Sequence, residues 1–144
     1  ADMQSYVGQE IGTSDWLTID QQRIDEFARA TGDEHWIHVD VERAARDLPD
    51  GKTIAHGFLT LSLITPFAGQ ISPVLEHANI LNYGANKIRF TAPVKAGDRV
   101  RMKRSLLQFE DLDKSMRLTF GNTIEIEGSE RPALYAETIS LIFK

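Results

Sequence analysis

The sequence predicts a single α+β domain in which a long antiparallel sheet wraps around one buried helix. Three observations support this fold class. The chain has 144 residues, which is close to the commonest size of one domain and enough to bury a single core. Residues 56–71 are apolar on nearly every side, as expected of a helix that its surroundings bury. After residue 80 apolar and polar residues alternate, which is the pattern of half-buried strands.

A first helix is expected soon after the start of the chain. Thr18 and Gln21 have the spacing of a capping box, in which the side chains at the first helical turn satisfy free backbone amides. Ile24 and Phe27 then recur at helical spacing. Gly32 is the residue type that most often ends a helix, so we expect this helix to end there.

Two further helices are expected in the middle of the chain. Asp40 can cap a short helix through residues 41–47, which Pro49 and the turn after it should close. The apolar stretch 56–71 is too short to span a membrane and should form the buried helix. Pro66 should bend or break this helix, because proline lacks the amide proton and clashes with the preceding turn. The segment between the first two helices reads as a loop.

Four strands are expected in the second half of the chain, joined by turns rich in Gly, Pro, Asp and Ser. In one of them Met116 and Leu118 share a face, while Arg117 and Thr119 share the other. Because the connections are short, we expect these strands to follow one another as an antiparallel meander. The predicted strands are "NKIRF", "DRVRMKRSLLQF", "MRLTFGNTIEIEG" and "ALYAETISLIF".

Composition narrows the class of protein. The sequence has 16 Lys and Arg against 21 Asp and Glu, and this net charge of -5 argues against a general attraction to nucleic acid or to anionic membranes. Without cysteine there is no disulfide framework and no Cys-ligated zinc, which is compatible with a reducing compartment. The chain shows no signal-like opening and no apolar run of roughly 18 residues, so we expect a soluble, cytoplasmic protein.

The segment "TGDEHWIHVD" at residues 31–40 gathers acidic side chains and two imidazoles beside a tryptophan. Together with "TIAHGFLTLSLI" and "KIRFTAPVKAGDRV" further along, it resembles the MaoC-like dehydratases, also called (R)-specific enoyl-CoA hydratases. The nodulation-protein-N-like branch of this family is the most similar. The resemblance extends from about Gly8 to Phe143 and implies one hot-dog domain over residues 1–144, which agrees with the fold class predicted above.

The resemblance also implies an activity. It points to hydration of trans-2-enoyl-CoA to (R)-3-hydroxyacyl-CoA, or the reverse dehydration, by a lyase of fatty acid metabolism. The substrate would be an acyl-CoA or acyl-carrier thioester, with no metal and no other cofactor, and the protein would be a homodimer. The family's catalytic Asp and His fall on Asp33 and His38. His35 and Trp36 stand where the family has Asn and Pro; Trp36 fits the nodulation-N-like branch, whereas His35 is unusual even there, which leaves the substrate open.

The chemistry of hydration calls for these residue types. Water must lose a proton to a base as it attacks C3, C2 must gain a proton, and the enolate oxygen needs hydrogen-bond donors. We expect His38 to be the base and Asp33 to orient the water or act as the acid; the sequence leaves open which of them holds which proton. The backbone N–H of Gly57, at the start of the buried helix, is expected to bind the enolate oxygen.

Other side chains near these motifs are candidates for binding the substrate. Trp36 and Phe58 could line an acyl tunnel, although such aromatic residues are more often core. His56 could contact the substrate or simply close the loop before the buried helix. Ser62 and Thr65 could hydrogen-bond the catalytic pair or be satisfied core hydroxyls. His77 lies in no motif.

Because the protein has a negative net charge, it needs local Lys or Arg side chains to bind the phosphates of CoA. Lys87 and Arg89 lie two apart on one predicted strand, as do Arg101 and Lys103 on another, so each pair points to one face. Such pairs are usually solvated sheet surface. Arg89 is the one we retain as a candidate for substrate binding.

Each motif residue has an ordinary structural alternative. A Gly-Asp pair after a helix is more often a cap and turn, and Asp40 fits a helix cap better than a catalyst. Asp33, His35, His38 and Asp40 could also bind a metal, but they lack the spacing of a known ligand motif. Two other functions stay open on the same fold: an acyl-CoA thioesterase, and a non-catalytic module that binds acyl-CoA or an acyl carrier.

Overall fold

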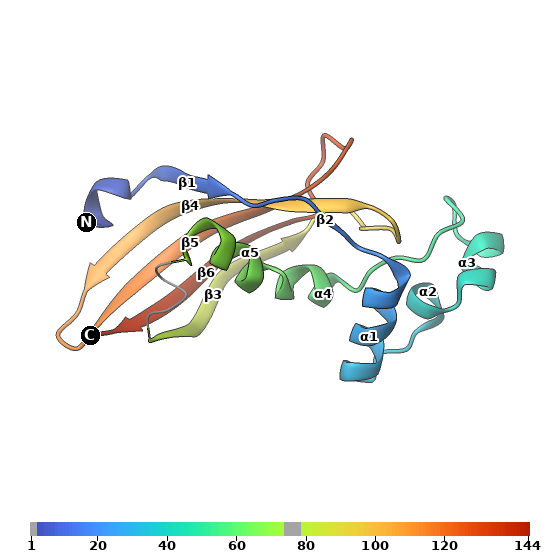
Figure 1. Ribbon diagram of the computed structural model, residues 1–144, viewed down its shortest axis with the longest axis horizontal. Helices are drawn as coiled ribbons and strands as arrows, with labels where there is room; N and C mark the ends of the chain where they lie inside the picture. Colours follow the sequence, from blue (N-terminus) through green and yellow to red (C-terminus); the bar gives the residue numbers. More distant parts are fainter. Residues whose placement is uncertain (1–2, 74–78) are drawn as a thin grey trace.

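One curved antiparallel sheet of six strands forms the body of the protein in the computed structural model, which describes residues 3–73 and 79–144 (Figure 1). His77 therefore lies outside the described residues. Strands and helices occur together, and the α+β fold class is as predicted. The strands are β1 (Gln9–Thr13), β2 (Leu17–Thr18), β3 (Ile80–Phe90), β4 (Arg99–Asp111), β5 (Ser115–Ile126) and β6 (Leu134–Phe143).

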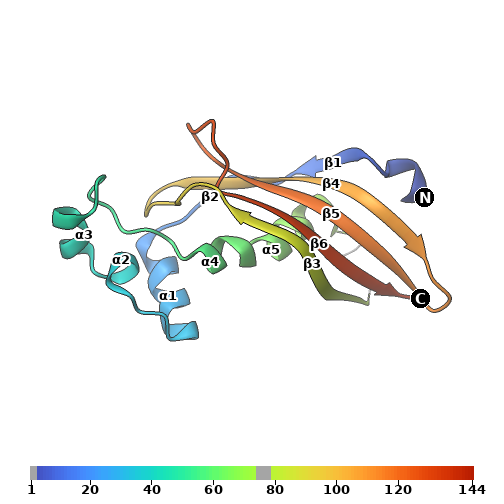
Figure 2. The same ribbon diagram turned by 180° about the vertical axis from the view of Figure 1, so that it is seen from behind.

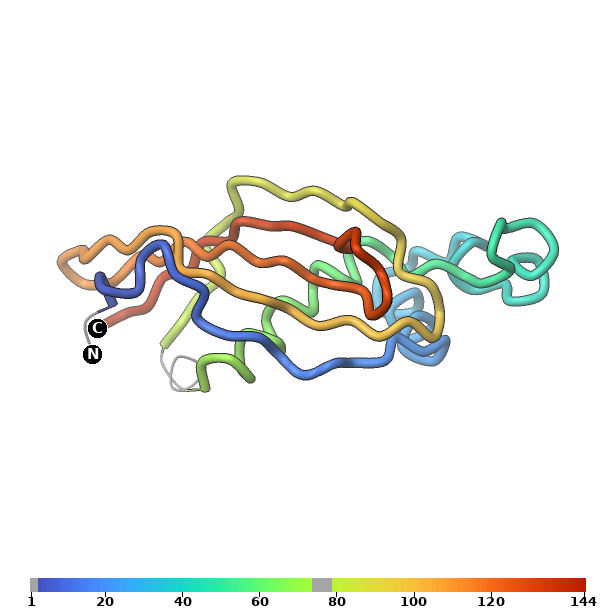
Figure 3. The backbone as a smooth tube through the Cα atoms, turned by 90° about the horizontal axis from the view of Figure 1, so that it is seen from above, coloured from blue at the N-terminus to red at the C-terminus, as the bar shows by residue number. Residues whose placement is uncertain are grey.

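The order of strands in the sheet is β1-β4-β5-β6-β3, with β2 also paired to β4. The predicted meander is confirmed for β4, β5 and β6, which are neighbours in the sheet (Figure 3). It is wrong for β3, which pairs with β6 and forms one edge of the sheet. The reason is that alternation reveals which face of a strand is buried, but not which strand lies beside it. Strands β1 and β2, which pair with the free side of β4, were not predicted because they are so short.

Three helices form a cluster beyond one end of the sheet, namely α1 (Gln21–Thr31), α2 (Trp36–Val39) and α3 (Val41–Asp47) (Figure 1). Helix α1 ends at Gly32, whose φ of 85° is the left-handed conformation that glycine adopts readily. Its cap is Asp20, which accepts a hydrogen bond from the amide of Arg23, so the expected Thr18–Gln21 capping box is wrong. Asp40 caps α3 as predicted. Helix α2 is one turn within the segment expected to be a loop.

The buried helix lies against the concave face of the sheet as two pieces, α4 (Gly57–Ser62) and α5 (Ile64–Ile71). The break falls at Leu63, three residues before Pro66. In a continuous helix Pro66 would donate its amide to the carbonyl of Ser62, and proline has no amide proton to give. The side chains that pack this helix on the sheet form the main core, which includes Leu59, Leu63, Phe67, Met102, Ile124 and Leu134. A short 3-10 helix, η1 (Met3–Tyr6), covers a second core cluster at the other end.

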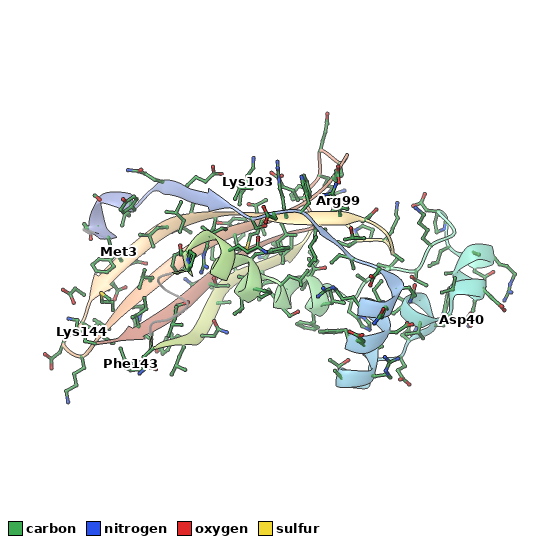
Figure 4. The ribbon with its side chains drawn as sticks, in the orientation of Figure 1. Met3, Asp40, Arg99, Lys103, Phe143 and Lys144 are labelled. Carbon is green, nitrogen blue, oxygen red and sulfur yellow. The ribbon has the colours of Figure 1, made fainter. Side chains whose placement is uncertain are left out.

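The opposite face of the sheet carries charge. Arg99 and Lys103 lie on the side of β4 that faces away from α4 and α5 (Figure 4). Arg101 and Lys103 both pair with Glu125 on β5, at 3.0 and 3.2 Å, so these cations form part of a charged outer sheet surface, as expected. Among the described helices none is long and apolar enough to cross a membrane.

Candidate active site

His38 lies in the single turn of α2, and its contacts define the tautomer of its imidazole ring. Its side chain is 9% exposed, and Nδ1 lies 2.5 Å from the carbonyl oxygen of Ile54. A carbonyl oxygen can only accept a hydrogen bond, so Nδ1 carries the ring proton. In the neutral imidazole Nε2 is then the bare nitrogen. His38 therefore presents the lone pair of Nε2 as an acceptor of a hydrogen bond or a proton.

His56, the residue before α4, supports the His38 ring. It is 3% exposed, and the two imidazoles stack with their centroids 3.8 Å apart. The Nε2 atom of His56 donates to the backbone carbonyl of Asp33 at 2.9 Å. Its Nδ1 atom is buried with no hydrogen-bond partner in the described parts of the chain. His56 thus joins the segment that carries Asp33 to the segment that carries His38.

Asp33 follows the glycine that ends α1, and its carboxylate is exposed. Its amide donates to Oγ1 of Thr31 at 3.3 Å, while its Oδ1 lies 3.4 Å from the amide of His35. One carboxylate oxygen of Asp33 and one ring nitrogen each of His38 and His56 lie within 4.8 Å of one another. A single water at hydrogen-bond distance from two of these atoms fits this spacing. Asp33 and His38, predicted to act together, are therefore close in space.

The same three side chains are also a set of atoms that could hold a metal ion. They differ from the four residues that the sequence suggested, because His56 takes part while His35 and Asp40 do not. Asp40 instead uses its carboxylate to accept a hydrogen bond from the amide of Arg43. One oxygen and two nitrogens are ligand types that zinc accepts.

The environment of His38 favours its neutral form. Burial is the largest cause and lowers the pKa of His38 below its ordinary value of 6.5. Nearby positive charge on His56 or His35 would lower this pKa further, whereas the Ile54 carbonyl and the Asp33 carboxylate raise it and are outweighed. An imidazole that stays neutral at physiological pH can accept a proton.

Gly57 lies on the same cavity as His38. This cavity has a volume of about 360 Å³, and Thr60 and Phe90 also contribute to its wall. As the first residue of α4, Gly57 has no acceptor within its own helix for its amide. A Cβ atom at this position would lie 3.0 Å from Cε1 of Phe90, so any side chain here would push against that ring. Glycine at this position leaves the space beside the Phe90 ring open and lets a ligand approach the backbone closely.

Gln21 is part of the site but was missed as such by the sequence analysis, which assigned it to a capping box. Its Nε2 atom donates to the backbone carbonyl of His38 at 2.8 Å and to Asp25 at 2.9 Å. Its Oε1 atom accepts a hydrogen bond from Thr53 at 2.5 Å. Gln21 therefore ties the His38 turn to α1 and to the loop before α4. Only the fold brings these segments together, so nothing in the local sequence could reveal this role.

A larger cavity of about 650 Å³ lies between α4, α5 and the concave face of the sheet. Ser62 and Thr65 both lie on its wall. The hydroxyl of Ser62 donates to the carbonyl of Leu59 at 2.6 Å, rather than to Asp33 or His38 as one interpretation had it. Arg104 also lines this cavity and is buried, a position that the sequence analysis overlooked.

The remaining predicted residues lie outside both cavities. Trp36 is half-buried, with the guanidinium of Arg43 4.0 Å from its ring centroid. Phe58 is 68% exposed and meets Phe90 edge-on, so the alternative that it belongs to the core is wrong. Arg89 is exposed on β3, where it donates to the carbonyl of Ile88.

Comparison with known proteins identifies the family. The sequence model described as "MaoC like domain" matches residues 2–127, which is most of the chain. The chain belongs to the MaoC-like dehydratase family. This MaoC-like chain is 49% identical over 140 residues to the 3-hydroxyacyl-thioester dehydratase Z of Mycobacterium tuberculosis, covering 96% of this chain and 92% of that protein. It is 48% identical to Nodulation protein N of Rhizobium leguminosarum bv. viciae, over 99% and 89% of the two chains.

Solved structures of the family share the fold. The (R)-hydratase from A. caviae involved in PHA biosynthesis superposes with a TM-score of 0.76 at 25% identity, over 93% of this MaoC-like chain and 94% of that one. The hot-dog architecture is thereby confirmed. Membership of this family of hydratases and dehydratases supports a lyase role for the chain.

Proposed function

We propose that this protein hydrates trans-2-enoyl-CoA to (R)-3-hydroxyacyl-CoA and catalyses the reverse dehydration. The observation that carries this proposal is the placement of His38, whose Nε2 is bare, which has a ring nitrogen within 4.8 Å of an Asp33 carboxylate oxygen and which lies on the same cavity as Gly57. A base, a second acid–base group and an oxyanion donor are the three elements that the reaction needs. The family relationship supports the same class of reaction.

In the proposed mechanism Asp33 and His38 hold one water between them. Nε2 of His38 takes a proton as the water oxygen forms its bond to C3, and the electrons of the C2–C3 double bond move onto the thioester carbonyl oxygen. When this enolate collapses, C2 receives a proton from the Asp33–His38 pair, which returns to its starting state. The product carries the elements of water across the former double bond. Acid–base groups of this kind typically contribute about 10²–10⁴-fold to the rate.

The amide of Gly57 is the proposed donor to the enolate oxygen. It lies at the positive end of a short helix, where backbone amides lack acceptors. Because the developing charge is on the thioester oxygen, a donor that is already in place stabilises the transition state more than the substrate. Loss of one such donor costs roughly 2.7–4 kcal/mol in other enzymes.

The acyl chain is proposed to lie along α4 and α5 in the larger cavity. The two cavities follow one another along the same elements: Thr60 and Phe90 line the first, and Leu61 and Ile88 line the second. A thioester carbonyl at Gly57 would therefore direct its chain into the space between the helix and the sheet. Apolar side chains on both sides of this space suit a hydrocarbon chain.

We also propose a homodimer that forms through β3. This 11-residue strand is at the edge of the sheet and exposed along most of its length (Figure 2). It carries the exposed side chains of Leu81, Tyr83 and Phe90. A long, apolar, unpaired edge favours pairing with another strand, and two copies of β3 can satisfy each other's backbone groups. Because Phe90 lines the smaller cavity, the proposed interface would lie beside the site.

The test of the proposed function is the loss of enoyl-thioester absorbance on a series of trans-2-enoyl-CoA substrates from crotonyl-CoA upward. We expect hydration to give the (R)-3-hydroxyacyl product, assigned by chiral chromatography. A parallel assay for free thiol detects thioester hydrolysis. Release of thiol without hydration would favour a thioesterase, and tight binding without turnover of any member would favour a binding module.

A further inference from the structure

Arg104 lies on the inward face of β4, where the neighbouring inward side chains belong to the core. Along β4 the residues that face α4 and α5 alternate with those that face away. Val100, Met102 and Leu106 on the inward face are fully buried apolar residues, and Arg104 stands among them with an exposed fraction of 6%. An arginine in this series is unusual, because charged side chains are almost never fully buried unless they are paired.

Within the part of the chain that the structure describes, the Arg104 guanidinium has no acidic partner. Among residues 3–73 and 79–144 no carboxylate lies within ion-pair distance of it, and its Nε atom makes no hydrogen bond. Its guanidinium carbon lies 3.6 Å from the ring centroid of Phe120, an aromatic contact that offsets only part of the lost hydration. Asn122, directly across on β5, donates its amide to Ala136 and Thr138 instead.

The charge persists despite burial. Loss of hydration lowers the pKa of Arg104 to about 10, which still leaves the guanidinium protonated at neutral pH. A buried charge without a partner costs stability, so its presence calls for a ligand or a function.

Arg104 is on the wall of the larger cavity, and the other residues there show what a ligand would meet. Leu61, Ile64 and Ile88 are apolar, while Ser62, Thr138 and Ser140 present hydroxyls. The cavity therefore combines hydrocarbon walls with one cation and several hydrogen-bonding groups. A ligand that matches it has an apolar chain and an anionic group.

The sheet register sets the distance between Arg104 and the proposed reaction centre. Arg104, Asn122, Ala136 and Ile88 lie in one row across the sheet, and Met102, Ile124, Leu134 and Phe90 lie in the row nearer the smaller cavity. Successive inward rows are about 7 Å apart at roughly 3.4 Å per residue. The guanidinium covers Phe120, which belongs to the next row beyond. A chain that starts at Gly57, which lies against Phe90, would thus reach the charge after about 7–14 Å.

We propose that Arg104 selects acyl thioesters whose chain ends in a carboxylate, which it binds inside the larger cavity. The inference rests on the proposed function and names the class of substrate for that same site. The carboxylate would supply the partner that the described residues do not, and Arg is suited to this task because its planar group can give a carboxylate two parallel hydrogen bonds. Thr138 and Ser140 lie on the same wall to complete the site.

The experiment compares kcat/KM for pairs of trans-2-enoyl-CoA substrates of equal length, one ending in a carboxylate and one in a methyl group. For the parent protein we expect a preference for the carboxylate of about 10- to 100-fold, expressed mainly in KM, as for a charge-assisted hydrogen-bonded contact. In Arg104→Met this ratio should fall to one or below. Arg104→Lys, which keeps the charge but not the paired geometry, should restore part of it.

Lys103→Met is the matched control, because it removes one positive charge from the neighbouring residue on the opposite face of the sheet. It should leave the ratio unchanged. Thermal melts check folding, and Arg104→Met should melt at or above the parent temperature because an unpaired buried charge is gone. If the parent hydrates members of the trans-2-enoyl-CoA series but shows no preference for the carboxylate, this inference is wrong. If no member of the series is hydrated, the proposed function itself fails.

Discussion

The imidazole rings of His38 and His56 stack with their centroids 3.8 Å apart and their planes at 22°. Each ring also donates one N–H to a backbone carbonyl, His38 to that of Ile54 and His56 to that of Asp33. The stack therefore positions both members of the proposed catalytic pair at once. Burial of the two rings keeps His38 neutral, as a base must be.

The pH dependence of the reaction tests this role of burial. For a base to work it must be unprotonated, so kcat/KM falls as the pH drops through the pKa of His38 in the free enzyme. Because that pKa is lowered, the acid limb of a kcat/KM profile for crotonyl-CoA should have its midpoint below pH 6.5. A midpoint above pH 6.5 would mean that His38 is not the group whose protonation stops the reaction.

A substitution at His56 tests, in the same kcat/KM profile against pH, whether His56 acts on the pKa of His38 without taking part in the proton transfer itself. His56→Gln removes an imidazole whose charge lowers the pKa of His38, while an amide N–H can still reach the Asp33 carbonyl. We expect the acid limb to move up toward pH 6.5, with a smaller loss of kcat at high pH than His38→Gln shows. An unmoved acid limb would show that the stacked ring has no electrostatic effect on the base.

Asp40 should contribute stability rather than catalysis. Its carboxylate accepts the amide of Arg43 at the start of α3. Asp40→Ala should lower the free energy of unfolding by about 0.5–2 kcal/mol, as for a lost helix cap, with little change in kcat. Asp47→Ala is the control, since it removes an exposed carboxylate at the other end of α3 and should cost less. A large loss of kcat in Asp40→Ala without a change in stability would contradict this assignment.

Chelation tests the metal alternative for the cluster of Asp33, His38 and His56. If these groups hold a water, dialysis against EDTA leaves hydration of crotonyl-CoA unchanged. A catalytic zinc would supply the activated water itself, so its removal would abolish turnover. Activity that returns only when metal is added would overturn the acid–base pair as proposed.

The proposed β3 interface predicts the mass in solution. Light scattering at micromolar concentration should give about twice the 16.2 kDa of one chain. Leu81→Lys places a charge on the exposed edge strand, a substitution that disfavours strand pairing, and should shift the mass toward that of one chain. Lys103→Met, on β4 away from this edge, should not. A parent protein that stays monomeric would contradict the proposed dimer.

Much of the fold could be predicted from local sequence, and the failures have physical reasons. The glycine that ends α1, the cap of α3 and the alternation along β4 and β6 each depend on neighbouring residues alone. The place of β3 at the edge of the sheet depends on pairing between distant segments, which periodicity does not encode.

The candidate site was also predictable only where its residues are close together in the sequence. Asp33 and His38 stand in one short motif, so they could be paired from the sequence. The contacts of Gln21 and the stacking of His56 join segments that meet only in the folded chain. Arg104 does carry a local signal, because it is a charged residue at an inward position of an alternating strand.

The central claim is that Asp33 and His38 act together on one water. The most direct test is kcat for hydration of crotonyl-CoA by Asp33→Asn, by His38→Gln and by the double variant, with a circular dichroism melt of each. His35→Gln, an exposed imidazole on the same segment, is the matched control and should be nearly neutral.

We predict that each single substitution lowers kcat by about 10²–10⁴-fold while the fold is kept. The double substitution should cost little more than the worse single one, because groups that serve the same step are not additive. The account would be contradicted if both single variants fold normally and still hydrate crotonyl-CoA within about tenfold of the parent rate, below the range expected for an acid–base group.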